Sequence, residues 1–275
     1  MKVTALCIYP VKSCRGVSLP ESVVTDYGLA GDREYVITTP EGHFITQRQI
    51  PRMATLSPDI QDSRLFLTAP DTGTLELSSL SGESCEVTVW KDRVVAQDLG
   101  DQAAEFVTTY LGTFKGQGLR VRRFLREHSR WVNEQYTDRR VPYGFADALP
   151  YLVVSDASLR DLNERLREKG HPHVPMNRFR PNIVLGESTP YQEDATAEIV
   201  IGRLISLRLA KACARCTITT VNQDTGEEEG VEPLATLAQF RKAERGVMFG
   251  QNAYLTQGRG ERIRVGDSVL TARQN

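Results

Sequence analysis

The stretch Cys213-Ala214-Arg215-Cys216-Thr217-Ile218-Thr219-Thr220 places two of the chain's five cysteines beside an arginine and directly before a β-branched run. The β-branched run predicts a strand, so Cys216 is expected where a loop enters a sheet. A guanidinium such as that of Arg215 favours the ionised form of a nearby thiol, and the thiolate is the form that binds metals or attacks electrophiles. We therefore look first for chemistry at residues 213–216.

Three interpretations of the Cys-x-x-Cys spacing are open on sequence alone. A dithiol redox pair requires a helix N-terminus after the first cysteine, which the β-branched run disfavours. A zinc site requires two further ligands, and the only clustered histidines are His171 and His173. The third interpretation is that Cys213 and Cys216 are structural cysteines that pack in the interior.

The totals describe an ordinary globular protein and exclude several classes. The 275 residues are 40% apolar and 25% charged, and 34 basic against 35 acidic side chains give a net charge of −1. No bulk field would attract nucleic acid or anionic lipid, so neither is expected as a partner. No apolar run has the length of a membrane span or of a signal peptide, and we expect a cytoplasmic protein. The odd number of cysteines argues against a disulfide framework.

Outward from residues 213–220, the pattern predicts a mainly β chain with some helix (α+β). Short period-two segments separated by turns dominate the first 95 residues, as in a β-sandwich or barrel. Helices are expected over 101–111, over 155–169 with Ser155 as N-cap, and over 234–245. Further strands are expected over 119–124, 182–185, 198–201, 204–209, 216–221, 253–256 and 263–271. We predict two β-barrel-like domains, residues 1–120 and 121–275.

Two further segments carry cations at loop-to-strand junctions. Lys12 and Ser13 lie in Tyr9-Pro10-Val11-Lys12-Ser13-Cys14-Arg15-Gly16, where an ammonium and a hydroxyl could bind a phosphate, although an ordinary solvated loop is the more common setting for such a segment. Arg180 precedes Pro181 and the strand that begins at Asn182, a position suited to anion recognition or to a rim salt bridge. Arg33, after Gly31-Asp32, is a third such cation. Together with a thiolate they would form a site for an anionic, metal-bearing cofactor.

Seven segments in order carry a family resemblance: YPVKSCRGV at 9–17, GLAGDREYVI at 28–37, DALPYLVVSDASLRDLN at 147–163, RFRPNIVL at 178–185, ARCTITTVNQDTG at 214–226, FGQNAYL at 249–255 and IRVGDSVL at 263–270. On these segments the chain resembles the molybdenum cofactor sulfurase C-terminal domain (MOSC) proteins, and among them the amidoxime-reducing group. The resemblance implies an N-terminal MOSC β-barrel domain joined to a MOSC domain with helical insertions, and a pyranopterin molybdenum cofactor between them.

The resemblance also implies roles for particular residues. Cys216 would ligate molybdenum, since soft thiolate ligation suits this metal. Arg215 would neutralise charge beside the metal, and Asp147 would position a proton or a water near its open face. The pterin and its phosphate would be held by Lys12, Ser13, Arg33, Arg180 and Asn182. The implied activity is reduction of N-hydroxylated compounds such as amidoximes, hydroxylamines or N-hydroxylated bases.

Two departures from the family pattern qualify these expectations. No compact four-cysteine tail follows the last expected strand, so we expect no iron–sulfur cluster in this chain. Either the electron donor is a separate protein (a ferredoxin, a flavoprotein reductase or a cytochrome), or the sequence is a truncated form. Ala214 and Leu149 stand where relatives often carry polar residues. The alternatives are a non-catalytic carrier of the molybdenum cofactor or of sulfur, and a cofactor-free β-barrel interaction module.

Overall fold

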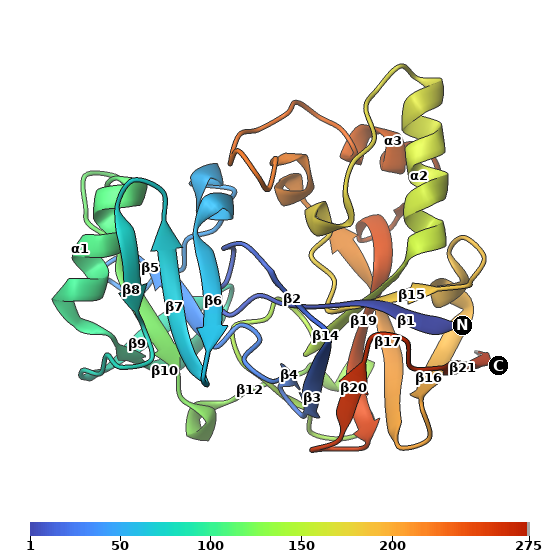
Figure 1. The fold of residues 1–275 in the computed structure, drawn as a ribbon, viewed down its shortest axis with the longest axis horizontal. Helices are drawn as coiled ribbons and strands as arrows, with labels where there is room; N and C mark the ends of the chain where they lie inside the picture. Colours follow the sequence, from blue (N-terminus) through green and yellow to red (C-terminus); the bar gives the residue numbers. More distant parts are fainter. Residues whose placement is uncertain (274–275) are drawn as a thin grey trace.

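The computed structural model describes residues 1–273, and its largest element is a nine-stranded sheet that runs through the C-terminal half of the chain (Figure 1). Strands β14 and β15 pair in parallel, and all the other pairs in this sheet are antiparallel. In spatial order the strands are β2 (Val17–Leu19), β1 (Lys2–Ile8), β15 (Ile183–Gly186), β14 (Tyr151–Ser155), β19 (Gly246–Gln257), β17 (Ile205–Arg215), β16 (Thr196–Ile201) and β21 (Val269–Arg273), with β18 (Lys242–Ala243) on β19.

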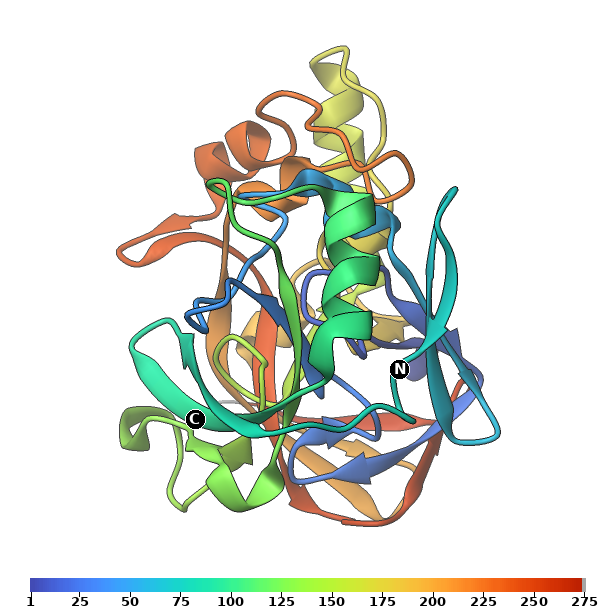
Figure 2. The ribbon, with the colours of Figure 1, turned by 90° about the vertical axis from the view of Figure 1, so that its left-hand side faces the viewer.

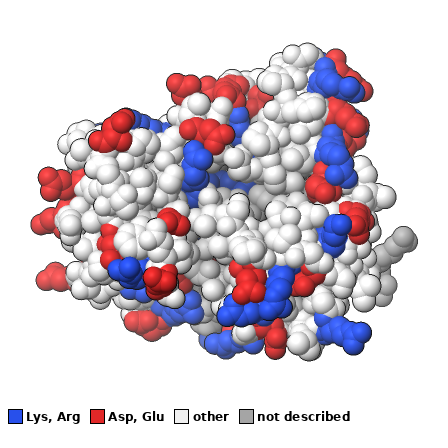
Figure 3. Space-filling model, viewed as in Figure 1, with Lys and Arg blue, Asp and Glu red and all other residues white. Residues whose placement is uncertain are grey.

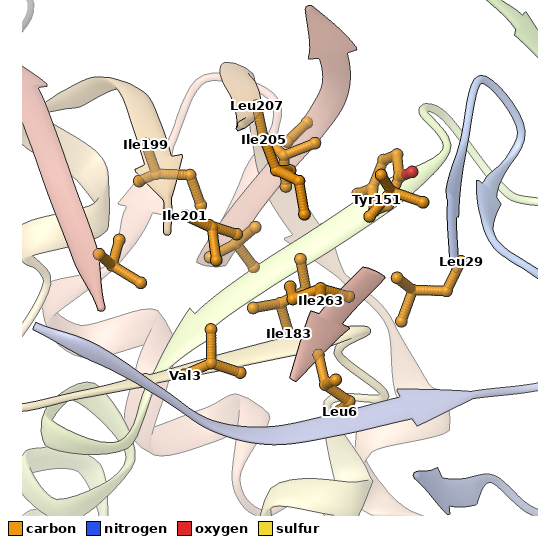
Figure 4. Packing of buried hydrophobic residues seen from close by; sticks show 14 of the residues in the cluster. Val3, Leu6, Leu29, Tyr151, Ile183, Ile199, Ile201, Ile205, Leu207 and Ile263 are labelled. Atoms are coloured by element: carbon orange, nitrogen blue, oxygen red, sulfur yellow. The ribbon is translucent and has the colours of Figure 1, made fainter. Parts of the chain in front are cut away.

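The sheet curls so that the start of β1 approaches β21. Lys2 forms an isolated bridge with Ser268, and the amide of Val269 donates to the carbonyl of Met1. Its enclosed face holds a cluster of aliphatic side chains, which point toward one another in Figure 4. Ile183, Leu207 and Ile263 have no exposed surface, and burying such a side chain contributes roughly 1.5–3 kcal/mol. This barrel-like sheet is the rigid support of the site described below.

A second β module is built from residues of the first half of the chain. It contains the four-stranded sheet β5 (Tyr35–Thr38), β11 (Arg120–Phe124), β10 (Asp92–Asp98), β9 (Ser84–Val89) and the three-stranded sheet β6 (Ser57–Gln61), β7 (Arg64–Ala69), β8 (Gly73–Glu76). Helix α1 (Gly100–Leu111) runs beside β11 (Figure 2), and its Ala103 and Val107 are buried in the same core as Val121 of that strand. The predicted α+β class with two barrel-like modules is confirmed.

Smaller strand pairings lie beside the large sheet. Strands β20 (Arg262–Arg264), β3 (Glu21–Thr25) and β4 (Gly28–Leu29) form one sheet, and β12 (Arg130–Trp131) pairs with β13 (Pro142–Tyr143). Strands β1 and β2 come from the first 120 residues, yet β1 pairs with β15 from the second half. The domain boundary near residue 120 stays a prediction.

Helix α2 (Asp156–Glu168) begins and ends as its sequence predicts. The Ser155 hydroxyl accepts a hydrogen bond from the amide of Ser158 at 3.0 Å, and Gly170, just beyond the last turn, takes a positive φ of 78°. Leu162 and Leu166 are fully buried against the sheet. Among the described residues no helix is long and apolar enough to cross a membrane.

The strand predicted over 216–221 is wrong, because residues Thr217–Thr220 form a 3-10 helix. The hydroxyl of Thr219 donates to the carbonyl of Cys216 at 3.0 Å, and that of Thr220 donates to the carbonyl of Thr217 at 2.8 Å. Threonine side chains offer the backbone such local partners in competition with a strand ladder. Cys216 therefore follows the end of β17 instead of opening a strand.

The helix predicted over 234–245 is shorter than expected. Helix α3 (Leu234–Phe240) stops before the short strand β18, which returns through Gly246 into β19. Gly246 has a φ of 126°, a backbone conformation that favours glycine. The predicted strand over 253–256 is the final part of β19, and the one over 204–209 is the first part of β17.

Candidate active site

A cavity of about 330 Å³ is lined by residues from both halves of the chain, and we call it the cationic cavity. Every site residue predicted from the sequence contributes to its wall: Lys12, Ser13, Arg33, Asp147, Arg180, Asn182, Arg215 and Cys216. Positively charged side chains outnumber acidic ones there, with Lys12, Arg33, Arg48, Arg180, Lys211 and Arg215 facing the single carboxylate of Asp147. Such a wall suits an anionic ligand.

This local excess of charge is not a property of the whole surface. Figure 3 shows acidic and basic side chains interspersed over the face that it presents, as the net charge of −1 requires. A larger groove of about 790 Å³ lies elsewhere, beside Tyr136 and Tyr254, and contains none of the predicted site residues. The cationic cavity is the one in which the chemistry-bearing groups converge.

Cys216 lies half-buried in the wall, and the cation nearest its sulfur is Arg48. Nη1 of Arg48 lies 3.6 Å from Sγ of Cys216. Arg215, which the sequence places beside Cys216, instead donates to Sγ of Cys213 at 2.9 Å and to the carbonyl of Phe179 at 2.7 Å. Residues two apart on a strand share a face, so at the end of β17 Arg215 lies on the side of Cys213.

Lys12 and Asp147 form an ion pair on one side of the cavity. Nζ of Lys12 donates to Oδ1 of Asp147 at 2.6 Å and to the carbonyl of Phe145 at 2.9 Å, and the Trp90 indole N–H donates to the same Oδ1 at 3.1 Å. Lys12 is 5% exposed, whereas the side chain of Asp147 is 65% exposed. The cavity thus has a buried side and an open side.

These contacts settle the charge of the pair at neutral pH. Burial lowers the pKa of Lys12, and Asp147 partly offsets that effect. Burial acts to raise the pKa of Asp147, but the charge and hydrogen bond of Lys12, with help from Trp90, hold it well below the ordinary value. Asp147 is therefore an ionised hydrogen-bond acceptor that anchors Lys12.

Arg33 and Arg180 lie against one aromatic ring. Their guanidinium carbons lie 4.5 Å and 4.1 Å from the centroid of the Tyr9 ring. Nη1 of Arg33 also donates to Asp32 at 2.5 Å and to Oδ1 of Asn182 at 3.0 Å. Burial raises the pKa of Asp32, and the neighbouring Arg33 opposes that rise. The two arginines are fixed by stacking and by buried polar groups before any ligand arrives.

Asn182 ties three parts of the wall together. Its Oδ1 accepts from the amide of Leu152 at 3.1 Å as well as from Arg33, and its Nδ2 donates to the carbonyl of Cys7 at 3.2 Å. The residue is 1% exposed. Its observed contacts position the backbone of two strands and the guanidinium of Arg33.

Backbone strain is concentrated in this wall. Four lining residues other than glycine have a positive φ: Ser13 (67°), Arg33 (48°), Trp90 (57°) and Arg180 (54°). Such conformations cost of order 1–3 kcal/mol each and persist only where the surroundings impose them. The strained backbone at these residues lowers the stability of the fold but places their side chains in the cavity wall.

Several residues of the site were missed by sequence reasoning. Besides Arg48 and Trp90, Gln47 and Gln223 pair through reciprocal amide hydrogen bonds of 2.9 and 3.0 Å, both side chains being buried. Gln47 also donates to the carbonyl of Ser13 at 2.7 Å. The pair fastens two loops that are far apart in sequence, and nothing local in either loop indicates that partnership.

The cavity fits an anionic, metal-bearing group. Nε of Arg215 is buried without a hydrogen-bond partner among the described residues, and Arg48 has no carboxylate partner there. A buried, unpaired donor is expensive unless a ligand accepts from it. Cys216 supplies a soft sulfur ligand. Within residues 1–273 no three His, Cys, Asp or Glu side chains group as metal ligands, so the zinc interpretation lacks its ligand set.

Fold and site together define a class: a two-module β protein whose cationic cavity is lined by the half-buried thiols of Cys213 and Cys216. Comparison with known proteins makes this specific. The family model of the MOSC N-terminal beta barrel domain matches residues 1–114, and that of the MOSC domain matches residues 140–270. This chain belongs to the MOSC family.

Curated relatives align over nearly the whole chain. Mitochondrial amidoxime-reducing component 1 of Mus musculus is 35% identical and covers 97% of this chain and 81% of its own length. The protein of the same name from Homo sapiens is 34% identical over 97% of this chain and 82% of its own. Molybdenum cofactor sulfurase of Solanum lycopersicum is 29% identical over 98% of this chain and 35% of its own length.

Proposed function

We propose that this protein is a molybdenum-cofactor-dependent reductase of N-hydroxylated compounds. The relatives' names provide the reaction class, and one observation carries the proposal to this chain. That observation is the cationic cavity itself, in which two half-buried thiols, Cys213 and Cys216, lie among six cationic side chains. A thiolate that ligates molybdenum and cations that hold a phosphate-bearing pterin account for both features.

In this proposal each group of the cavity wall has a part. Cys216 ligates the metal, and Lys12, Ser13, Arg33, Arg180 and Arg215 hold the anionic part of the cofactor. Asn182 keeps Arg33 in place, as its 3.0 Å hydrogen bond indicates. When bound, the cofactor supplies the two electrons that cleave the N–O bond of the substrate.

The rest of the chemistry is proton handling, since two protons are needed to yield the reduced nitrogen compound and water. Asp147 stays ionised at neutral pH, so it acts as an acceptor that keeps the buried Lys12 ammonium in position. The open side of the cavity, beside the exposed Asp147, admits the water that delivers these protons. Lys12 is a better proton donor than an ordinary lysine because burial lowers its pKa.

We also propose that the electrons come from a separate protein, a ferredoxin, a flavoprotein reductase or a cytochrome. The reaction consumes two electrons per turnover, and the only thiol assigned to the metal, Cys216, is used as a ligand. A separate redox protein of one of these kinds would supply both electrons.

The experiment is elemental analysis for molybdenum and turnover of benzamidoxime with a chemical reductant. It compares wild type, Cys216→Ala and Cys213→Ala, all purified without oxygen from a host that makes the cofactor. Cys213 is the matched control, a half-buried cysteine of the same cavity wall. We expect near-stoichiometric molybdenum and turnover in wild type and in Cys213→Ala, and neither in Cys216→Ala.

Other outcomes lead elsewhere. Molybdenum in wild type without turnover of any N-hydroxylated compound, together with a persulfide on Cys216, would favour the carrier alternative. A folded wild-type protein without molybdenum, alongside a loaded control enzyme, would refute the proposal.

A further inference from the structure

Arg48 is a cation of the cavity wall without an anionic partner in the described chain. Its side-chain contacts are the 3.6 Å approach of Nη1 to Sγ of Cys216 and stacking on the Trp90 ring, with 4.6 Å between guanidinium carbon and ring centroid. By contrast, Arg33 has Asp32 as an ionic partner. A half-buried guanidinium beside the metal-ligating thiol retains free donors.

The loop that carries Arg48 is rigid. The amide of Arg48 donates to Oγ1 of Thr46 at 3.2 Å, and that hydroxyl donates to Oε1 of Gln49 at 2.6 Å. The preceding residue, Gln47, is fixed by its buried pairing with Gln223. The guanidinium is therefore delivered by a backbone that is already ordered.

Trp90 holds the other side of Arg48 at the mouth of the cavity. The indole is 48% exposed, contacts Phe44 edge-on at 5.1 Å and donates to the exposed Asp147. Its φ of 57° is strained for a bulky residue, which indicates that tertiary contacts impose this position. Arg48 thus lies where the open side of the cavity meets Cys216, and the buried side belongs to residues such as Lys12 and Asn182.

We propose that Arg48 is a substrate-contacting catalytic residue that donates a hydrogen bond to the oxygen of the substrate's N–O group, and that Trp90 is the residue that positions it. A ligand entering from the open side meets Arg48 on its way to the metal site. As a cation with N–H donors, the guanidinium stabilises the charge that develops on the oxygen as the N–O bond breaks, without transferring a proton. The class of ligand rests on the proposed function; the place of the subsite rests on the geometry.

The experiment measures binding apart from turnover. Benzamidoxime is titrated by calorimetry into oxidised, molybdenum-loaded protein without reductant, and the molybdenum content of every variant is determined. Arg48→Gln is expected to bind about tenfold or more weakly at unchanged molybdenum content, because a hydrogen bond from a charged donor is lost. Arg52→Gln is the matched control, since Arg52 also stacks on an aromatic ring, that of Tyr110 at 4.1 Å, but does not line the cavity.

Trp90 is tested by two substitutions in the same assay. Trp90→Phe keeps a ring for Arg48 to stack on and should bind within about twofold of wild type, whereas Trp90→Leu removes the ring and should weaken binding several-fold. Rescue by phenylalanine is the result that a merely structural role for the exposed indole does not predict.

The outcomes separate this inference from the proposed function. Unchanged affinity in Arg48→Gln overturns the inference, and so does loss of molybdenum from that variant, which would assign Arg48 to the cofactor. Wild type that binds benzamidoxime through Arg48 but turns over no N-hydroxylated compound would remove the proposed function and leave the binding subsite in place.

Discussion

Replacement of Asn182 by leucine tests whether one buried amide organises the cavity wall. The side chain is 1% exposed and makes three hydrogen bonds, to Leu152, Arg33 and Cys7, at 3.1, 3.0 and 3.2 Å. Leucine has a similar volume but leaves the buried Leu152 N–H without its acceptor, which costs about 1–3 kcal/mol. The lost bond from the charged Arg33 adds about 1.5–3 kcal/mol.

Two effects limit the total destabilisation caused by Asn182→Leu. Arg33 keeps its contact with Asp32, and the apolar leucine gains some burial energy. We therefore expect the free energy of unfolding to fall by about 3–5 kcal/mol, a large part of the 5–15 kcal/mol typical of folded domains. Urea unfolding followed by circular dichroism and by tryptophan fluorescence measures this, and coincident transitions show whether a two-state treatment holds.

Asn252→Leu provides the matched control for this measurement. Asn252 also lines the cavity and is 8% exposed, but its side chain makes one hydrogen bond, to the carbonyl of Lys211 at 3.3 Å. Its loss should cost only about 1 kcal/mol. Equal costs for the two substitutions would refute the claim that Asn182 is a structural node.

Three further predictions concern titration and packing. Lys12 lowers the pKa of Asp147, so the pair stabilises the fold above the ordinary aspartate pKa and ceases to do so as the pH falls below about 4. The Asp147→Asn protein should lack this part of the loss of stability in acid, which acid unfolding of the variant and the wild type measures. Burial raises the pKa of the Cys14 thiol to about 12. Iodoacetamide at about pH 8 should therefore leave Cys14 of the native protein unalkylated, as measured by mass spectrometry, and rapid labelling would contradict its burial. Gly250 has a φ of 80°, and a Cβ at this position would lie 2.6 Å from a methyl group of Val154. Gly250→Ala should therefore lower the free energy of unfolding by roughly 2–4 kcal/mol in the urea assay, and an unchanged value would show that β19 shifts freely.

The fold was predictable wherever local pattern and tertiary structure agree. Helix α2 has its N-cap at Ser155 and its buried leucines at helical spacing, so the sequence alone defines it. The run after Cys216 shows the opposite case. Its β-branched residues favour a strand, but three of the four are threonines, and the hydroxyls of Thr219 and Thr220 donate to backbone carbonyls three residues earlier. Strand propensity depends on residue type alone, so it does not include these hydrogen bonds between threonine hydroxyls and nearby backbone carbonyls.

Four of the six cations of the cavity were predictable from the sequence, and the partners of these cations were not. Lys12, Arg33 and Arg180 stand at loop-to-strand junctions, which sequence pattern can locate. The partner of Cys216 could not be found in this way, since Arg48 is 168 residues distant in the chain and lies in a segment with no distinguishing pattern. Adjacency in sequence suggested Arg215, and the alternation of a strand turned that side chain toward Cys213.

The strained residues explain why the cavity depends on the whole fold. Ser13, Arg33, Trp90 and Arg180 carry side chains that glycine could not supply, in a backbone conformation that glycine would adopt more easily. Local preference therefore opposes the geometry at each of these positions, and tertiary contacts such as the stacking on Tyr9 and the Trp90–Asp147 hydrogen bond must impose it. A binding wall made in this way is ordered before its ligand arrives, because the strain is already compensated in the folded protein. The residues of the wall also depend on one another, so loss of the Asn182 side-chain contacts should displace Arg33 and, through Tyr9, Arg180 as well.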